Sequence, residues 1–144
     1  MKKIKKITFI SGSRADFFIS EGLINTTAQF FDTTVILHAG HLQHEYGLLA
    51  NIAQKKIAKL KIIKLNSNIG YSNNRSELNL SFASQIKKIG FKLKIINPDA
   101  VILIGDRTET LAASCSCLLR SIPIIHVHGG ELSFGSMDEK LRHA

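Results

Sequence analysis

The carboxylates of the chain are unevenly distributed. Five of the eleven acidic residues lie from position 106 onward, among segments that are otherwise apolar: Asp106, Glu109, Glu131, Asp138 and Glu139. Carboxylates gathered near the ends of buried segments are candidates for proton transfer or ligand binding. This distribution suggests a functional site in the C-terminal part of the chain.

Two histidines, His126 and His128, are two positions apart on one face of an expected strand and precede Gly129, Gly130 and Glu131. Together with Asp138, they could form a metal site of imidazole and carboxylate ligands. The alternative is that His126 is a hydrogen-bonded core histidine and that His128, beside the glycine turn, meets a substrate. We favour this alternative, and we expect no metal and no cofactor.

A second chemical signal lies near the N-terminus, where Gly12, Ser13 and Arg14 connect an expected strand to an expected helix. The N–H groups at the start of a helix can bind phosphate, and an arginine adds a charged donor. A purely structural turn would require only Gly12. The segment is neither G-x-G-x-x-G nor a P-loop, and the expected strands lack the acidic residue that binds ribose, which argues against a dinucleotide cofactor.

Other polar residues have a functional and a structural interpretation. Asp106 could act on a substrate or merely cap the following helix, although Arg107 beside it favours the functional interpretation. Asp138 and Arg142 are four positions apart on one helix face, where they could pair with each other or contact substrate. His41 follows Gly40 at the end of another expected strand.

The elements that must position these residues alternate between strand and helix. The hydrophobic patterns predict strands over 4–11, 33–39, 59–65, 100–105 and 124–128, and helices over 17–30, 41–56, 76–96, 108–120 and from 137. The partly charged third strand is expected at an edge, and the continuously apolar fourth one is expected to be covered on both faces of the sheet. This order predicts an α/β fold, a Rossmann-like doubly wound parallel sheet whose ligands bind at the carboxyl ends of the strands.

Size and charge narrow the possible classes of function. At 144 residues the chain is expected to be one domain (1–144), incomplete at its C-terminus because the last helix has no cap. Its net charge of +8 comes from lysine-rich faces without aromatic residues between them, so we expect no nucleic-acid partner. No apolar run is long enough to span a membrane. Cys115 and Cys117 are expected as reduced thiols that point apart, which fits the cytoplasm.

Four motifs, taken together, resemble those of the hydrolysing UDP-N-acetylglucosamine 2-epimerases of sialic-acid and legionaminic-acid biosynthesis. They occur in the family's order and spacing: Gly12-Ser13-Arg14-Ala15-Asp16, Gly105-Asp106-Arg107-Thr108-Glu109, His126-Val127-His128-Gly129-Gly130-Glu131, and Asp138-Glu139 with Arg142-His143-Ala144. The resemblance covers the whole chain. It implies the N-terminal half of a GT-B-type fold, in which two Rossmann-like domains face each other across a cleft, and we expect the second domain to be absent from this chain.

The resemblance also implies a reaction. In this family UDP leaves C1 as the C2 proton is lost, and water then adds to the 2-acetamidoglucal intermediate and releases the 2-epimer, such as N-acetylmannosamine. The matching positions imply acid–base roles for Asp106 and Asp138 and a phosphate contact for Arg14. Related enzymes often carry Glu at the position of His128, so either His128 or Glu131 takes the other proton-transfer role. Further substrate contacts are expected from Gly12, Ser13, His41, Arg107 and Arg142.

Because the second domain supplies most uridine and diphosphate contacts in the family, the resemblance implies a UDP-sugar substrate but little activity for this chain alone. The sugar could be UDP-N-acetylglucosamine or a 2,4-diacetamido analogue. One alternative is a binding module or half-enzyme that needs a separate C-terminal domain or a homo-oligomer. Another is a truncated product without function, which would expose apolar surface.

Overall fold

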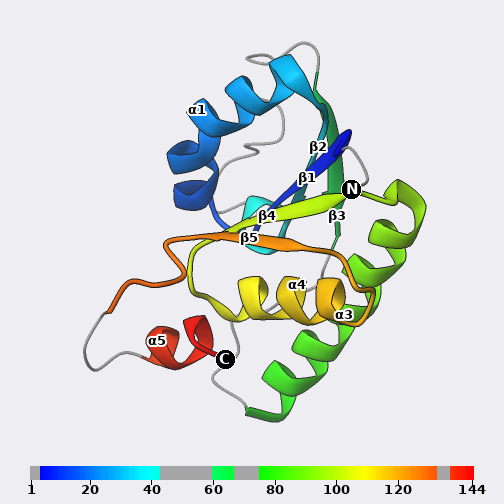
Figure 1. Cartoon of the computed structure of the whole chain (residues 1–144). Helices are drawn as coiled ribbons and strands as arrows, with labels where there is room; N and C mark the ends of the chain where they lie inside the picture. The colour runs from blue at the N-terminus through cyan, green and yellow to red at the C-terminus, as the bar shows by residue number, and fades with distance from the viewer. Residues whose placement is uncertain (1–3, 43–59, 67–74, 133–136) are drawn as a thin grey trace.

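The core of the protein is a five-stranded parallel sheet, seen in a computed structural model that describes residues 4–42, 60–66, 75–132 and 137–144 (Figure 1). The strands are β1 (Lys6–Ser11), β2 (Asp32–His38), β3 (Lys61–Leu65), β4 (Ala100–Ile104) and β5 (Ile124–Val127). Their spatial order is β3-β2-β1-β4-β5, so that β3 lies at one edge and β4 is paired on both sides. The expected edge position of β3 is confirmed, and so is the expected burial of β4, whose five residues are all buried.

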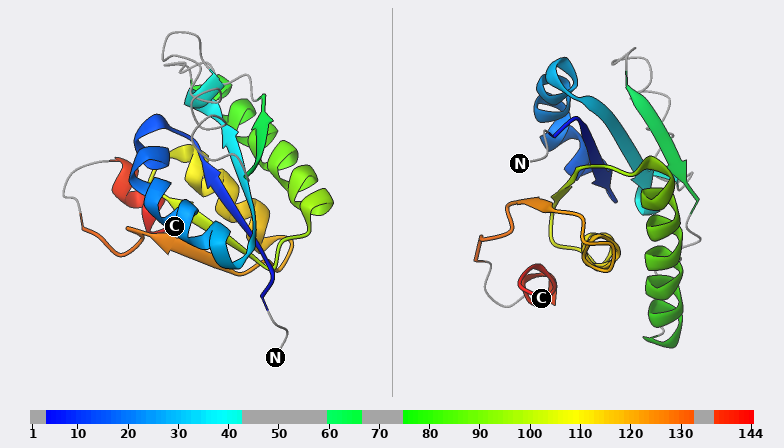
Figure 2. Two further views of the ribbon diagram at one scale, coloured as in Figure 1. Left: turned by 90° about the horizontal axis from the view of Figure 1, so that it is seen from above. Right: turned by 45° about the vertical axis from the view of Figure 1, so that its right-hand side comes forward.

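Helices connect the strands and cover both faces of the sheet. They are α1 (Arg14–Phe30), α3 (Arg75–Ile96), α4 (Thr108–Leu118) and the short α5 (Met137–Arg142), with a 3₁₀ turn, η1 (Ala39–Leu42), after β2. Figures 1 and 2 show α1 on one face of the sheet and α3 with α4 on the other. The Rossmann-like doubly wound sheet is thus confirmed. The helix expected over 41–56 lies mostly outside the described residues.

Alternation of side chains along the strands divides the core into two layers. On one face, Phe17 and Ile24 of α1 pack against a cluster that includes Ile102 of β4. On the other, Leu93 of α3 packs in a cluster with Leu103 of β4. The continuous apolar run of β4 follows from this arrangement, since its five residues are all buried and serve both layers.

Two turns at the ends of strands have the geometry that places polar groups above the sheet. Helix α1 begins at the N-cap Ser13, whose hydroxyl accepts a hydrogen bond from the Asp16 amide at 3.2 Å. Strand β4 is followed by Gly105 with a backbone φ of +90°, a conformation that residues other than glycine rarely adopt. Helix α4 then starts after Arg107, without a side-chain hydrogen bond at its cap. Asp106 is therefore not a helix cap.

Two further sequence-based expectations concern the membrane and the thiols. Among the described helices, none has both the length and the apolar character needed to cross a membrane. Cys115 and Cys117 are both free, as expected; Cys117 is fully buried and Cys115 is half-buried. Burial raises the pKa of the Cys117 thiol to about 12, so it stays protonated at neutral pH.

Candidate functional site

The carboxyl ends of β1, β4 and β5 lie level with one another and bring three polar segments to one rim of the sheet. Ile10 of β1 is in register with Leu103 of β4, and Ile104 of β4 with Val127 of β5. Immediately beyond these positions come the segments 11–16, 105–109 and 128–131. Rims of this kind are where open α/β sheets bind their ligands.

Arg142 is the centre of a polar network at this rim. Its Nη2 group donates to a carboxylate oxygen of Asp106, and Nη1 donates to the backbone carbonyl of Glu131 at 2.8 Å. The guanidinium therefore joins α5 to the segments that follow β4 and β5. Arg142 thus pairs with Asp106, 36 positions away in the sequence. One interpretation of the sequence had paired Arg142 with Asp138. The backbone of Asp138 belongs to α5, but its side chain is outside the described part of the structure.

His128 and Glu131 form a second contact in the same network. Nδ1 of His128 and Oε1 of Glu131 are hydrogen-bonded, and both side chains are exposed. His128 has a φ of +63°, a left-handed conformation that is uncommon for a residue other than glycine. Because the carboxylate accepts a hydrogen bond from the Nδ1–H group, the Nε2 atom of the neutral imidazole carries the lone pair. A histidine held this way can act as a base.

His126 plays a different part from His128. Its Nε2 group donates to the backbone carbonyl of Gly105 at 2.7 Å and so ties β5 to the turn after β4. A side chain at Gly129 would collide with the His126 ring, because a Cβ there would be 2.6 Å from Nδ1. His126 thus has the structural role that we favoured. The strand ends at Val127, however, so the two histidines do not share one strand face.

The first loop lies beside the turn after β4. The carboxylate of Asp16 is so close to Gly105 that a Cβ at that glycine would be 3.1 Å from Oδ1. Burial raises the pKa of Asp16, opposed by its hydrogen bond to Ser13 and by the positive charge of Arg107. Arg14 is the first residue of α1 and is exposed.

Beneath the first loop lies a buried layer of polar side chains. His41 is fully buried, contacts the ring of Phe17 edge-on, and has its Nε2 atom 2.9 Å from the hydroxyl of Ser11. Gly12 is packed so closely that a Cβ there would be 2.9 Å from Cβ of Glu109. The structure therefore places His41 under the loop and not on the surface of the rim, where a substrate contact had been expected.

The network unites most of the residues selected from the sequence. Asp106, Arg142, Glu131 and His128 are linked through side-chain or backbone contacts, while Ser13 and Arg14 lie across the rim on α1. Arg107 exerts its charge on Asp16, between the two groups. The expected roles of these residues in binding and catalysis stay predictions.

Sequence reasoning assigned no specific role to Asp16 or His38 and noted Glu109 only as one of the carboxylates near Asp106, although all three lie at this rim or beneath it. Asp16 and Glu109 belong to the quoted motifs, and each lies in the first turn of a helix that follows a rim glycine, a signal that could have given them a role. His38 ends an apolar strand and is almost fully buried, so its periodicity matched that of a core residue.

The described residues contain no group of three or more histidine, cysteine, aspartate or glutamate side chains arranged to hold a metal ion. A pocket of about 240 Å³ lies between α4, β5 and α5, and its wall includes Asp106, His126 and Arg142. The pocket therefore adjoins the network through the Asp106 and Arg142 pair.

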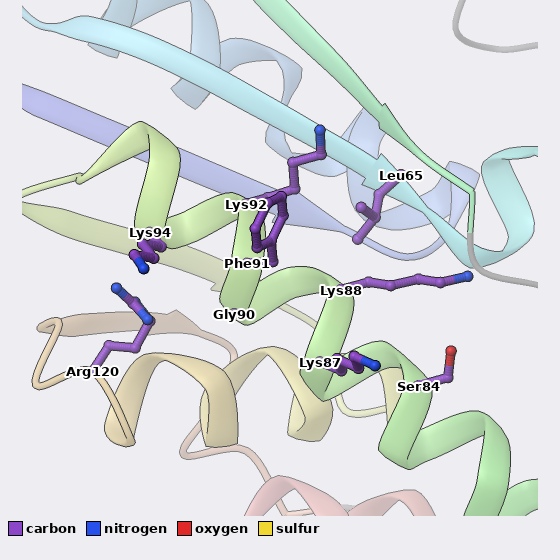
Figure 3. Close-up of a pocket in the computed structure, with 9 residues that line it drawn as sticks. All are labelled: Leu65, Ser84, Lys87, Lys88, Gly90, Phe91, Lys92, Lys94 and Arg120. Atoms are coloured by element: carbon purple, nitrogen blue, oxygen red, sulfur yellow. The ribbon is translucent and has the colours of Figure 1, made fainter.

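A larger pocket of about 660 Å³ lies on α3, at the β3 edge of the sheet and away from this network (Figure 3). Its lining residues are Leu65, Ser84, Lys87, Lys88, Gly90, Phe91, Lys92, Lys94 and Arg120. It has cationic and apolar side chains but neither a carboxylate nor a histidine among the residues that line it. It therefore lacks the carboxylate and imidazole groups that the network at the strand ends combines.

A comparison with models of protein families shows to which family the chain belongs. The family model described as UDP-N-acetylglucosamine 2-epimerase matches residues 25–144, which is most of the chain. The chain belongs to the UDP-N-acetylglucosamine 2-epimerase family. This confirms the resemblance drawn from the four motifs.

Individual members of the epimerase family match the chain over almost its whole length. It is 29% identical over 142 residues to the hydrolysing GDP/UDP-N,N′-diacetylbacillosamine 2-epimerase of Campylobacter jejuni, covering 97% of this chain and 36% of the relative. It is 32% identical over 151 residues to the hydrolysing UDP-N,N′-diacetylbacillosamine 2-epimerase of Legionella pneumophila, covering 98% of this chain and 37% of the relative. The chain thus spans little more than a third of the length of these epimerases.

Solved structures of the family share the fold. The UDP-GlcNAc 2-epimerase of Neisseria meningitidis, in a crystal structure with UDP-GlcNAc bound, superposes with a TM-score of 0.74 at 22% identity. The match covers 95% of this chain and 37% of that enzyme. The parallel sheet described above is therefore the fold of one portion of these epimerases.

Proposed function

We propose that this chain is the N-terminal portion of a hydrolysing UDP-sugar 2-epimerase and that it carries the acid–base half of the active site. The observation that carries the proposal is the network joining Asp106, Arg142, Glu131 and His128 at the strand ends. Its location agrees with the general position of ligand sites in this type of sheet. The family membership and the names of the relatives in Campylobacter and Legionella supply the reaction class and the sugar class.

In the proposed reaction, a base removes the proton from C2 of the sugar while the C1–O bond breaks and UDP leaves with the bonding electrons. Water then adds to C1 of the resulting 2-acetamidoglucal and a proton returns to C2 from the opposite face. The products are UDP and the free 2-epimer. Two groups with different protonation states are required, because one must accept a proton and the other must donate one.

His128 is the base that the geometry favours. Its Nδ1 group is hydrogen-bonded to Glu131, which fixes the tautomer and leaves Nε2 to accept a proton, while the carboxylate stabilises the imidazolium that forms. This assignment gives both residues a role in one proton transfer. Asp106 is proposed as the second acid–base group, and Asp138, whose backbone belongs to α5, as a further one.

Leaving-group stabilisation is the proposed role of the first loop. The N-terminal amides of α1 and the guanidinium of Arg14 provide donors for the diphosphate, with Gly12 and Ser13 shaping the turn. Arg107 is proposed as another substrate contact. Because the relatives are almost three times as long as the chain, the remaining diphosphate and uridine contacts are proposed to come from a second Rossmann-like domain in a GT-B arrangement. A separate polypeptide or a second copy of the chain could supply them instead.

The chain alone is therefore expected to bind a UDP-sugar weakly without releasing UDP. The free thiols of Cys115 and Cys117 fit a reducing compartment, and we propose the cytoplasm. The rival proposal of a nucleotide-sugar binding module makes the same prediction for the isolated chain but not for a completed enzyme.

A fusion protein distinguishes the epimerase proposal from the binding-module proposal. Residues 1–144 are joined to the part of the Legionella relative that lies outside the match. UDP release is then followed with UDP-N-acetylglucosamine and with the 2,4-diacetamido sugar as substrates. The fusion is expected to release UDP. Asp106→Asn and His128→Gln should each slow release at least about a hundredfold, the usual contribution of an acid–base group. Asp32→Asn, which changes an exposed carboxylate at the opposite end of the sheet, should not.

A folded fusion that binds the sugar but never releases UDP would favour the binding module. Release by the isolated chain, abolished by Asp106→Asn, would contradict the need for a second domain. The pair of sugars also shows which substituents at C4 and C6 the enzyme accepts.

A further inference from the structure

A short series of hydrogen bonds runs from η1 to the backbone of the first loop. His41 Nε2 is 2.9 Å from the hydroxyl of Ser11, and the same hydroxyl donates to the carbonyl of Ser13 at 3.1 Å. The side chain of Ser13 then accepts from the amide of Asp16 at 3.2 Å. Thus η1, the end of β1 and the first turn of α1 are connected through polar contacts.

The direction of these bonds follows from counting protons. A serine hydroxyl has one proton, and Ser11 gives it to the carbonyl of Ser13. The contact between Ser11 and His41 therefore requires His41 to donate from Nε2. Neutral imidazole carries only one N–H group, so Nδ1 of His41 is unprotonated and has no hydrogen-bond partner among the described residues.

The surroundings of His41 fix the ring and keep it away from any ligand. The side chain is 0% exposed and lies edge-on against Phe17 of α1, with ring centroids 6.2 Å apart. The charge of Arg14 acts on the same ring and disfavours its protonation. A ring so enclosed cannot touch a ligand directly, and its contacts join it to Ser11 at the end of β1 and to Phe17 of α1.

The loop held in this way has little freedom to adjust. The space beside Gly12 is occupied by Glu109 and His38, since a Cβ there would be 2.9 Å from Cβ of Glu109 and 3.7 Å from Nε2 of His38. The backbone of Ser13 is fixed by the Ser11 hydroxyl and by its own capping bond. Arg14 is the next residue of the chain and follows directly from this fixed backbone.

We propose that His41 is a positioning residue: as an Nε2–H donor to Ser11, it holds the backbone of Gly12 and Ser13 in the conformation that presents Arg14 and the first amides of α1 to a diphosphate. The identity of the anion rests on the proposed function above. The effect of His41 on the loop does not depend on it.

The loop effect is measured on the free 144-residue chain by nuclear magnetic resonance. The nitrogen shifts of the His41 ring in the unmodified protein should show the Nε2–H tautomer. His41→Phe keeps a ring against Phe17 but removes the donor, so it should shift the amide signals of Gly12, Ser13 and Arg14. His41→Gln can place an N–H group near the same point and should restore them.

Ser11→Ala should reproduce the His41→Phe pattern, and Ser20→Ala is the matched control. Ser20 is likewise buried, but its hydroxyl donates to carbonyls of α1 and not to the loop. The proposal is overturned if the ring is in the Nδ1–H form, or if His41→Phe shifts the loop signals no more than Ser20→Ala does. The tautomer and Ser11→Ala decide the matter even if His41→Phe fails to fold.

Titration with UDP then tests what the loop is for. His41→Phe and Ser11→Ala are expected to weaken binding about tenfold, the value of about one hydrogen bond in the right geometry, while His41→Gln keeps the affinity. Equal affinity in all four proteins overturns the link between His41 and the diphosphate. If the unmodified chain binds no UDP, the proposed function fails for the isolated chain, and the loop measurement still decides the role of His41.

Discussion

Two imidazole rings, those of His38 and His41, are almost entirely withdrawn from solvent at the end of β2. Burial lowers the pKa of each from 6.5 to about 4, with a smaller effect of His41 on His38 and of Arg14 on His41. Both histidines are therefore neutral at physiological pH. Their environment explains why they can donate or accept hydrogen bonds beneath the loop without bringing a charge there.

The same shift predicts how stability depends on pH. The unfolded chain takes up a proton at each histidine near pH 6.5, whereas the folded chain does so only near pH 4, so acid favours unfolding across this range. Each histidine contributes up to about 3 kcal/mol to the loss. Urea unfolding at about pH 7.5 and about pH 5 should show lower stability at the lower pH. His41→Gln should reduce the difference in stability between the two pH values. Equal stability of the unmodified chain at both pH values would contradict the lowered pKa values of the two histidines.

At the scale of elements, the turn between β1 and α1 and the helix that follows it each contain a glycine, and the two glycines differ in the space around them. Gly12 is the residue at which the turn meets α4, because the space for its missing side chain is filled by Glu109. Within α1, Gly22 has no atom within 4 Å of where a Cβ would be. The two glycines therefore have opposite effects when replaced by alanine.

Gly22→Ala should stabilise the protein by about 0.5–1 kcal/mol, because glycine is a poor residue for a helix interior. Gly12→Ala should destabilise it by about 1–3 kcal/mol, as expected for overpacking. Denaturant midpoints of the two variants measure both effects. Gly12→Ala with unchanged stability would mean that α4 can move away from the loop without cost.

At the scale of the whole molecule, stability depends on the central position of β4 between two layers. Leu103 is buried among residues of α3, α4 and the neighbouring strands, while Ile125 of β5 is 49% exposed. Leu103→Ala leaves a cavity and should cost about 2–5 kcal/mol. Ile125→Ala should cost clearly less, because little of its surface is withdrawn from water. Thermal unfolding of both variants shows which substitution costs more stability. Similar losses would contradict the conclusion that Leu103 lies in the core and Ile125 does not.

The order of elements was predictable from the sequence because each element has its own hydrophobic period. The run Ala100–Ile104 is apolar throughout, and the residues of α3 that pack inward recur at helical spacing. Glycines and polar turns then locate the strand ends, which in a parallel sheet are also where ligands bind. The fold class and the rim segments could therefore be identified before any contact was known.

Contacts between distant segments needed the tertiary structure. The pair of Asp106 with Arg142, the bond between His126 and Gly105, and the burial of His41 beneath Ser11 join residues 21 to 36 positions apart. Sequence spacing reports only neighbours on one element, so it suggested Asp138 for Arg142 and the rim surface for His41. Which side chain faces solvent and which supports the loop is decided by packing, because only the assembled layers determine where water is excluded.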